Sequence, residues 1–480
     1  MKQAQGRSKT TRLLTEGKPW KVLISFATPI FLSQLFQQLY NTADSLIVGN
    51  FLGKEALAAV NSSGSLIHLL TSFFVGASMG AGVVISRYFG AGDHERVSRA
   101  VHTNAVFSLI CGIVLSLFGA IMTPQILRWM GVPDDVLPRS TEYLRYYFTG
   151  CVPVVMYNSL KGVMNAVGDS RRPLYVIVFS SFLNAALDLF LVCVLGMEVA
   201  GAAVATVISQ FLSGLICLLI ILRKFPELIP HGREDWRFDL KYYWEHLRVA
   251  VPMALQFSVT GVGCVILQSA FNQFGSDTVA ATTAASRLEG LICIPFFAIG
   301  TTLAAYAAQN SGANNYRRIL VGVRSGWLIT AFVAVTGAIL MMVFSAQLLQ
   351  MFLDVKASPD ILRAGRQYIY TVAPAYISLG MILIFRNTLQ GMGCSLIPLL
   401  GGAMETLSRI FTAVYLAKWF GYTGACFASG ITWTITGVML LVYYMYEIRA
   451  RLRGKRTGVG AKHPVGLGRS CKCAKSSRPT

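Results

Sequence analysis

The sequence has few charged residues and few acids among them. Charged side chains make up 13% of the 480 residues, and Asp and Glu number only 22 against 42 Lys and Arg. Soluble domains are closer to 25% charged. The chain also lacks an H-E-x-x-H motif, and its six histidines form no cluster at metal-ligand spacing. We therefore expect no enzyme, no catalytic residue and no bound cofactor.

Apolar residues are correspondingly abundant. They make up 54% of the chain, and the mean hydropathy is +0.55. They gather into runs such as 101–123, 174–195 and 325–344, each long enough for the roughly 20 residues that cross a bilayer as a helix. With breaks at the polar stretches, the sequence predicts an all-α membrane protein of twelve spans.

The net charge of +20 comes from basic residues in the connections. Most of the Lys and Arg fall in alternate connections, on the side that carries both chain ends. The positive-inside rule places that side in the cytoplasm. The charge thus predicts topology rather than a nucleic-acid partner. Residues 1–18 contain no removable signal sequence, so we expect a multi-pass protein of a bacterial plasma or inner membrane.

The two halves of the chain repeat each other. Pro29 matches Pro252, and Gly168 with Pro173 matches Gly393 with Pro398. Because each half holds an even number of spans, the halves should be related by a pseudo-two-fold axis along the membrane normal. We expect a cytoplasmic segment 1–19, an N-lobe 20–223, a linker 224–245, a C-lobe 246–447 and a basic, disordered tail 448–480. The Cys471-x-Cys473 pair in that tail offers too few ligands for a metal.

A polar stripe runs along the first span. Its residues follow helical spacing on one face, and they are Gln34, Gln37, Gln38, Asn41 and Asp44. A stripe facing lipid is implausible because polar groups there are costly. The stripe could serve hydrogen bonding between helices, which is the simpler of two explanations. We favour a wet cavity, because an acid ends the stripe.

A second acid lies one turn from an amide on the fifth span, in the pair Asn184 and Asp188. Asp188 falls in the outer half of the membrane, where Asp44 can reach it. Asn158 on the fourth span and Thr206 on the sixth could add neutral oxygens. Such a group suits Na⁺, or a proton held between two neighbouring acids; a capped or paired structural acid is the alternative.

The ionisable residues within the spans of the second half differ from those of the first half. Glu405 and Arg409 are four residues apart and are predicted to pair with each other. Glu289 on the eighth span has two possible roles: it lines the substrate cavity, or it forms a structural pair. Eight of the ten cysteines lie in or beside apolar spans, where they pack as small hydrophobes.

These residues carry a resemblance. Thr15-Glu16-Gly17, Gln37-Gln38-Leu39-Tyr40-Asn41 through Asp44, and Gly90-Ala91-Gly92-Asp93 resemble the multidrug and toxic compound extrusion family over residues 12–447. The resemblance implies a V-shaped pair of six-helix lobes that exports organic cations against Na⁺ or H⁺. In the branch with a cation site in the amino-terminal lobe, the site residues are similar to Asp44, Asn158, Asn184, Asp188 and Thr206. The bending proline is similar to Pro29.

The function expected from these features is multidrug efflux by antiport, in which the carboxylates serve ion and substrate in turn. Drug-like small molecules and membrane lipids are the expected partners, and one chain is expected to suffice. A flippase for lipid-linked saccharides is the main alternative, and it should need a strongly cationic cavity. A membrane-embedded acyltransferase and a passive channel are further alternatives.

Overall fold

The computed structural model describes residues 14–129, 137–229, 240–352 and 359–454, and within these ranges the chain is helical with no strand. The first half consists of α1 (Pro19–Ala91), α2 (His94–Trp129), α3 (Leu137–Thr149), α4 (Cys151–Ala166), α5 (Arg171–Asp188), η1 (Leu189–Val194), α6 (Glu198–Lys224) and η2 (Pro226–Leu228).

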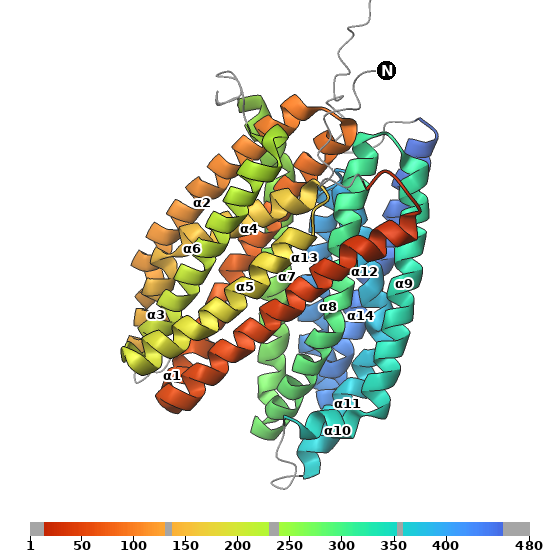
Figure 1. The fold of residues 1–480 in the computed structure, drawn as a ribbon. Coiled ribbons are helices and arrows are strands. Elements are labelled where there is room, and N and C mark those ends of the chain that lie inside the picture. Colours follow the sequence, from red (N-terminus) through yellow and green to blue (C-terminus); the bar gives the residue numbers. More distant parts are fainter. Residues whose placement is uncertain (1–13, 130–136, 230–239, 353–358, 455–480) are drawn as a thin grey trace, which may run out of the picture.

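The second half is divided into more elements, because α7, η3 and α8 stand where the first half has the single long helix α1. It consists of α7 (Leu240–Phe271), η3 (Asn272–Phe274), α8 (Ser276–Gly312), α9 (Tyr316–Val343), α10 (Ser345–Gln350), α11 (Pro359–Val372), η4 (Ala373–Ala375), α12 (Tyr376–Gly391), α13 (Leu396–Phe411), η5 (Thr412–Leu416) and α14 (Ala417–Leu452). Figure 1 shows the two halves side by side as two bundles of tilted helices.

The described part of the chain crosses the membrane twelve times, as predicted. Ten helical ranges are long and apolar enough for a crossing. One of them, Leu396–Leu452, holds two crossings, α13 and α14, which part at η5 and at a kink at Gly421. The remaining crossing is α3 with α4, which is less apolar. The protein is therefore a two-lobed, multi-pass helical membrane protein.

The backbone confirms the internal repeat at points that need special geometry. The turn after the first span is at Gly53, with φ of 87°, and the turn after the seventh is at Gly275, with φ of 89°. This left-handed region is readily adopted only by glycine. The π-helical segments η1 and η5 also occupy matching places, directly after α5 and α13.

Helix α1 belongs to both lobes. Its first turns, including Leu23, Phe26 and Ile30, lie in one continuous apolar core with α8, α9 and α12 of the second half. Further along, Phe36 packs against the core of the first half. Figure 1 shows this helix crossing the front of the molecule from one bundle to the other. The expected N-lobe of residues 20–223 thus begins with a segment that packs in the opposite lobe.

The lobes meet at the end of the bundle where the chain begins. The Gln309 amide of α8 donates to the Ala166 carbonyl of α4 at 2.9 Å and accepts from the Leu14 backbone at 2.8 Å. Tyr88 of α1 hydrogen-bonds Glu245 of α7. The Arg318 guanidinium donates to carbonyls of the segment before α1, including that of Gly17 at 2.7 Å. These bonds close the inter-lobe seam at this end.

Two of the expected boundaries can be compared with these helices. Helix α7 begins at Leu240, inside the expected linker 224–245, and α14 continues to Leu452, beyond residue 447. Residues 230–239 of the linker and residues 455–480 of the tail, including Cys471 and Cys473, lie outside the described residues.

Close backbone contact across the seam yields a first prediction. A Cβ atom at Gly90 would lie 2.1 Å from the Gln309 carbonyl oxygen, whereas a Cβ at Gly290 would meet nothing within 4 Å. Gly90→Ala should therefore cost about 1–3 kcal/mol through overpacking and lower the thermal melting temperature in detergent. Gly290→Ala, the matched control on α8, should not lower it, since alanine favours a helix. Equal melting of the two variants would contradict this close contact.

Candidate functional site

The polar stripe of α1 divides between two environments. Gln34 and Gln37 line a cavity between the lobes. Gln38 and Asn41 are exposed, and Asp44, at the end of the stripe, is half-buried. Because Asp44 follows Gln37 by seven positions on the helix, their backbones lie about 10 Å apart along the helix axis. One helix therefore presents amides to a cavity and a carboxyl to a second site further along.

That second site is a pair of facing carboxyl groups. Asp188, the last residue of α5, is 0% exposed, and its carboxyl interacts directly with that of Asp44. Apart from this contact with each other, both oxygens of Asp188 and one of Asp44 have no hydrogen-bond partner among the described residues. Two adjacent carboxylates repel each other strongly away from water. The arrangement is therefore suited to a shared proton or a cation between them.

Neutral polar groups surround the pair. Asn184, one turn before Asp188, is buried, and its amide nitrogen has no partner among the described residues. Thr206 of α6 accepts a hydrogen bond from the Tyr40 hydroxyl at 3.2 Å. Gln210, one turn after Thr206, is buried with an unpaired carbonyl oxygen. Oxygens of this kind, together with carboxylates, are the ligands of hard cations such as Na⁺.

Two members of this group were missed in the sequence. Tyr40 lies one turn before Asp44, and Gln210 lies one turn after Thr206. Both contribute to the environment of the acids, because Tyr40 interacts with Gln210 and with both carboxyl groups. A search at helical spacing from each predicted ligand would have found them.

The cavity has a volume of about 210 Å³ and lies between the lobes. Both halves of α1 line it together with α4, α5 and, from the second lobe, Thr301, Ala304 and Ala305 of α8. Asn158 lines this cavity, and its amide donates to the Val154 carbonyl at 2.9 Å. Asp44, Asn184, Asp188 and Thr206 are not among the lining residues. The five predicted cation ligands thus occupy two places. Asn158 lines the cavity, and the other four residues belong to the cluster around the two acids.

The cavity also contains a cation that the sequence analysis did not single out. Lys161 follows Asn158 by three residues on α4, so both lie on one helical face. Its ammonium group lies 5.5 Å from the centre of the Tyr157 ring. None of the lining residues is acidic. The cavity lining therefore contains a basic residue and no acid, whereas the second site contains two acids.

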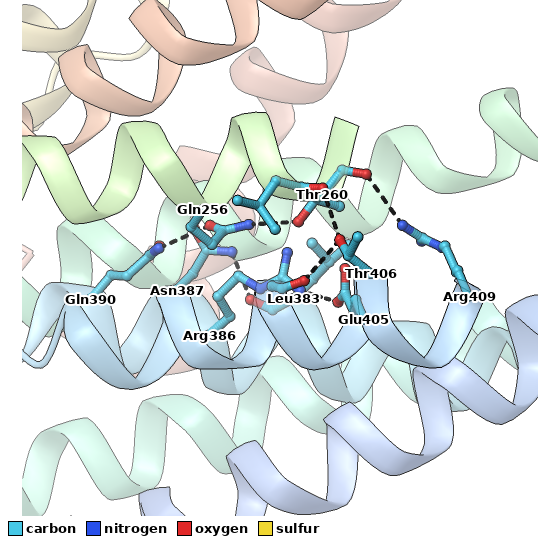
Figure 2. Close-up of polar contacts among 11 residues, drawn as sticks. Gln256, Thr260, Leu383, Arg386, Asn387, Gln390, Glu405, Thr406 and Arg409 are labelled. Atoms are coloured by element: carbon cyan, nitrogen blue, oxygen red, sulfur yellow. Dashed lines mark hydrogen bonds and ion pairs between the residues drawn. The ribbon is translucent and has the colours of Figure 1, made fainter. Parts of the chain in front are cut away.

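Polar groups of the second lobe are largely paired with one another (Figure 2). Arg386 of α12 forms an ion pair with Glu405 of α13, and both side chains are less than 10% exposed. The Arg409 guanidinium donates to the Thr260 carbonyl at 3.3 Å. The predicted pairing of Glu405 with Arg409 is therefore wrong. A facing helix supplies a closer arginine, and this tertiary contact replaces the local one.

Glu289 lies in the second lobe, away from the residues that line the cavity. It is half-buried and accepts a hydrogen bond from the Tyr368 hydroxyl at 3.0 Å. Tyr368 in turn packs edge-on against Phe271. The contacts of Glu289 are thus those of a half-buried acid held within its own lobe.

Pro29 is buried within α1, and the backbone remains helical there. Proline has no N–H to donate to the carbonyl four residues earlier. The Ser33 hydroxyl donates to the Pro29 carbonyl at 2.8 Å. Pro29 directly precedes Ile30, which packs in the core of the second lobe and also lines the cavity, so a bend at Pro29 would move the cavity-lining turns relative to the start of the helix.

One catalytic pattern was overlooked in the sequence. Residues 76–80, Gly-Ala-Ser-Met-Gly, match G-x-S-x-G. That motif requires a sharp turn between a strand and a helix, but these residues lie inside α1. The Ser78 hydroxyl donates to the Asn158 carbonyl at 3.0 Å. Ser78 thus joins α1 to α4 and lacks the setting of a nucleophile.

Two six-helix lobes, a cavity between them and an unpaired acid cluster beside it define a membrane transporter. The MatE family model matches residues 29–190 and 252–415. The "Probable multidrug resistance protein YpnP" of Bacillus subtilis is 28% identical over 441 residues, covering 90% of this chain and 96% of that protein. The "FAD transporter" of Shewanella oneidensis is 25% identical over 382 residues, covering 77% and 82%.

Solved structures share the fold. One, described as an outward-facing multidrug resistance MATE family transporter, aligns with a TM-score of 0.87 and 22% identity, covering 94% of this chain and 100% of the other. The chain belongs to the MatE family. It is a multi-pass membrane transporter and not an enzyme.

The buried ion pair of the second lobe yields a second prediction. Glu405→Gln leaves the Arg386 charge unpaired, which should cost roughly 3–5 kcal/mol and markedly lower the melting temperature. Asp360→Asn is the matched control, because the Arg363–Asp360 pair has side chains 85% and 81% exposed and such pairs stabilise little. Replacing Arg386 and Glu405 together by methionine should recover much of the loss. Wild-type melting of Glu405→Gln would contradict the assigned pair.

Proposed function

We propose that this protein is a secondary multidrug efflux antiporter, which exports amphipathic compounds in exchange for Na⁺ or H⁺ by alternating access. The observation that carries the proposal is the Asp44–Asp188 pair, in which both oxygens of the fully buried Asp188 and one oxygen of Asp44 have no hydrogen-bond donor among the described residues. Burying an acid in a membrane is costly. A cation that binds reversibly to the two carboxyl groups gives these acids a partner during part of the transport cycle.

Helix α1 supplies the connection between ion and substrate. It carries Asp44 at one site and Gln34 and Gln37 at the other, and its first turns are anchored in the second lobe. A cation that draws Asp44 and Asp188 together also shifts the helix that lines the cavity. Coupling requires ion and substrate to bind the two states with different affinity, since equal affinity shifts nothing. In this proposal ion and substrate bind at separate sites, whereas the sequence led us to expect that the carboxylates serve ion and substrate in turn.

The conformation fits one half of such a cycle. The lobes are joined at the end where the chain begins. With both termini in the cytoplasm, as the charge distribution predicts, this is an outward-facing state. We propose a bacterial plasma-membrane location and a single chain as the transporting unit, since one chain supplies both lobes and the cavity.

The names of the relatives support transport of amphipathic compounds and are compatible with substrates of either charge. One is named for multidrug resistance and another as a FAD transporter. FAD is an anion that carries an apolar ring system. Organic cations are therefore one candidate class among several.

A flippase for lipid-linked saccharides is a second candidate, favoured by Lys161 in a cavity without lining acids. A pyrophosphate head group calls for several cations, and Lys161 is the one basic residue among the lining residues. Export of compounds of moderate size accounts better for a cavity of about 210 Å³.

The antiport proposal predicts the behaviour of Asp188→Asn. The purified variant in vesicles should lose uphill efflux of a fluorescent amphipath under an imposed Na⁺ or pH gradient, because the cation loses a carboxylate. Asp277→Asn, which changes an exposed acid at the start of α8, should transport as the wild type does.

The gradient that drives the wild type identifies its ion. Uphill movement under neither gradient, for a cationic and an anionic dye alike, would contradict antiport. Full coupled efflux by Asp188→Asn would contradict the assigned ion site.

A further inference from the structure

The inter-lobe cavity has a charge opposite to that expected for a cation exporter. Its lining combines one ammonium group, that of Lys161, with amides, hydroxyls and apolar side chains, and contains no carboxylate. The acids that could attract a cationic substrate, Asp44 and Asp188, lie outside the lining. The electrostatic potential inside the cavity therefore favours a negative group.

Lys161 has no acidic partner in the described part of the chain. The ion pairs found there join other residues, and the contact assigned to its ammonium group is the Tyr157 ring at 5.5 Å. Lys161 is half-buried, and an ammonium group held away from water without a counter-ion is unfavourable. A bound anion would supply the missing charge.

A second polar group at the cavity also lacks a partner. Tyr157, which lines the cavity one turn before Lys161, is 1% exposed, and its hydroxyl has no hydrogen-bond partner among the described residues. An unpaired buried hydroxyl is uncommon in folded proteins. The hydroxyl can donate to an anionic oxygen, which a cationic ligand would not provide.

The rest of the lining sets the shape of the ligand. Val75, Met79, Val83 and Ile177 supply an apolar surface beside the polar groups. Drug-sized pockets hold about 300–1,000 Å³, so about 210 Å³ accommodates an acidic head group on a small ring system, with any larger part outside the cavity.

We propose that the inter-lobe cavity binds the anionic group of an amphipathic substrate, a carboxylate or a phosphate on an apolar ring system, through the Lys161 ammonium and the Tyr157 hydroxyl. The proposal rests on the proposed function in that it names the substrate class of the same transporter. Substrate anion and coupling cation then occupy separate sites, one formed by groups of α4 and the other by the acids of α1 and α5.

The test measures binding of matched naphthalene probes to the full-length protein in lipid nanodiscs, without any ion gradient. The probes are naphthoate, naphthyl phosphate, the neutral naphthamide and a naphthylmethylammonium. The wild type should bind at least one of the two anions about tenfold or more tightly than the neutral and cationic probes. Comparison of naphthoate with naphthyl phosphate distinguishes a carboxylate site from a phosphate site.

Variants at Lys161 locate the source of any preference. Lys161→Met should abolish the roughly tenfold preference while keeping much of the affinity for naphthamide, and Lys161→Arg should retain it. Lys224→Met, at an exposed lysine that ends α6, should bind as the wild type does. Preference for the ammonium probe, or an anion preference that survives in Lys161→Met, would overturn the proposal.

The outcome is independent of coupling. Because no gradient is present, Lys161-dependent anion binding can hold even if neither Na⁺ nor H⁺ drives efflux. Conversely, ion-driven efflux with no anion preference would leave antiport intact and reject this substrate class.

Discussion

Two carboxyl groups facing each other inside a membrane bundle are the constraint on which the remaining features depend. Asp188 is fully buried, and neither of its oxygens has a partner among the described residues. Repulsion from Asp44 adds to the cost of burial. Nearby hydrogen-bonding groups such as Asn184 and Gln210 are left with unpaired atoms. In the mechanism that we propose, a small cation binds at this site. Because Asp44 belongs to α1, binding of the cation also shifts the helix that lines the cavity.

The internal repeat shows that this site was built on one lobe of a symmetric frame. The glycine turns and π-helical segments recur in both halves. Asp188 ends α5, whereas the offset that relates Pro173 to Pro398 places Ala413 at the matching position of the second half. In the second lobe the buried acids have donors: Glu405 has Arg386, and Glu289 has Tyr368. The first lobe thus holds unpaired acids and the second holds satisfied ones.

The sequence predicted the frame because its signals are local. Apolar runs, alternating basic connections and repeated Gly and Pro are read along the chain, and the twelve crossings and the repeat are confirmed. Features that depend on contacts between distant segments were missed or wrong. Arg386 replaces Arg409 as the partner of Glu405, Lys161 faces the cavity, and the start of α1 packs in the opposite lobe. Which side chain meets which acid is decided by helix packing, which spacing within one helix does not encode.

The most direct test of the central claim measures ion release from the purified protein when a substrate binds. A Na⁺ electrode and a pH indicator in weakly buffered solution would follow the wild type and Asp44→Asn as an amphipathic substrate is added. The account predicts that the wild type releases one of the two ions and that Asp44→Asn releases neither, because the carboxyl pair that holds the cation is broken. Substrate binding with no release from the wild type, or equal release from Asp44→Asn, would contradict the carboxyl pair as the coupling site.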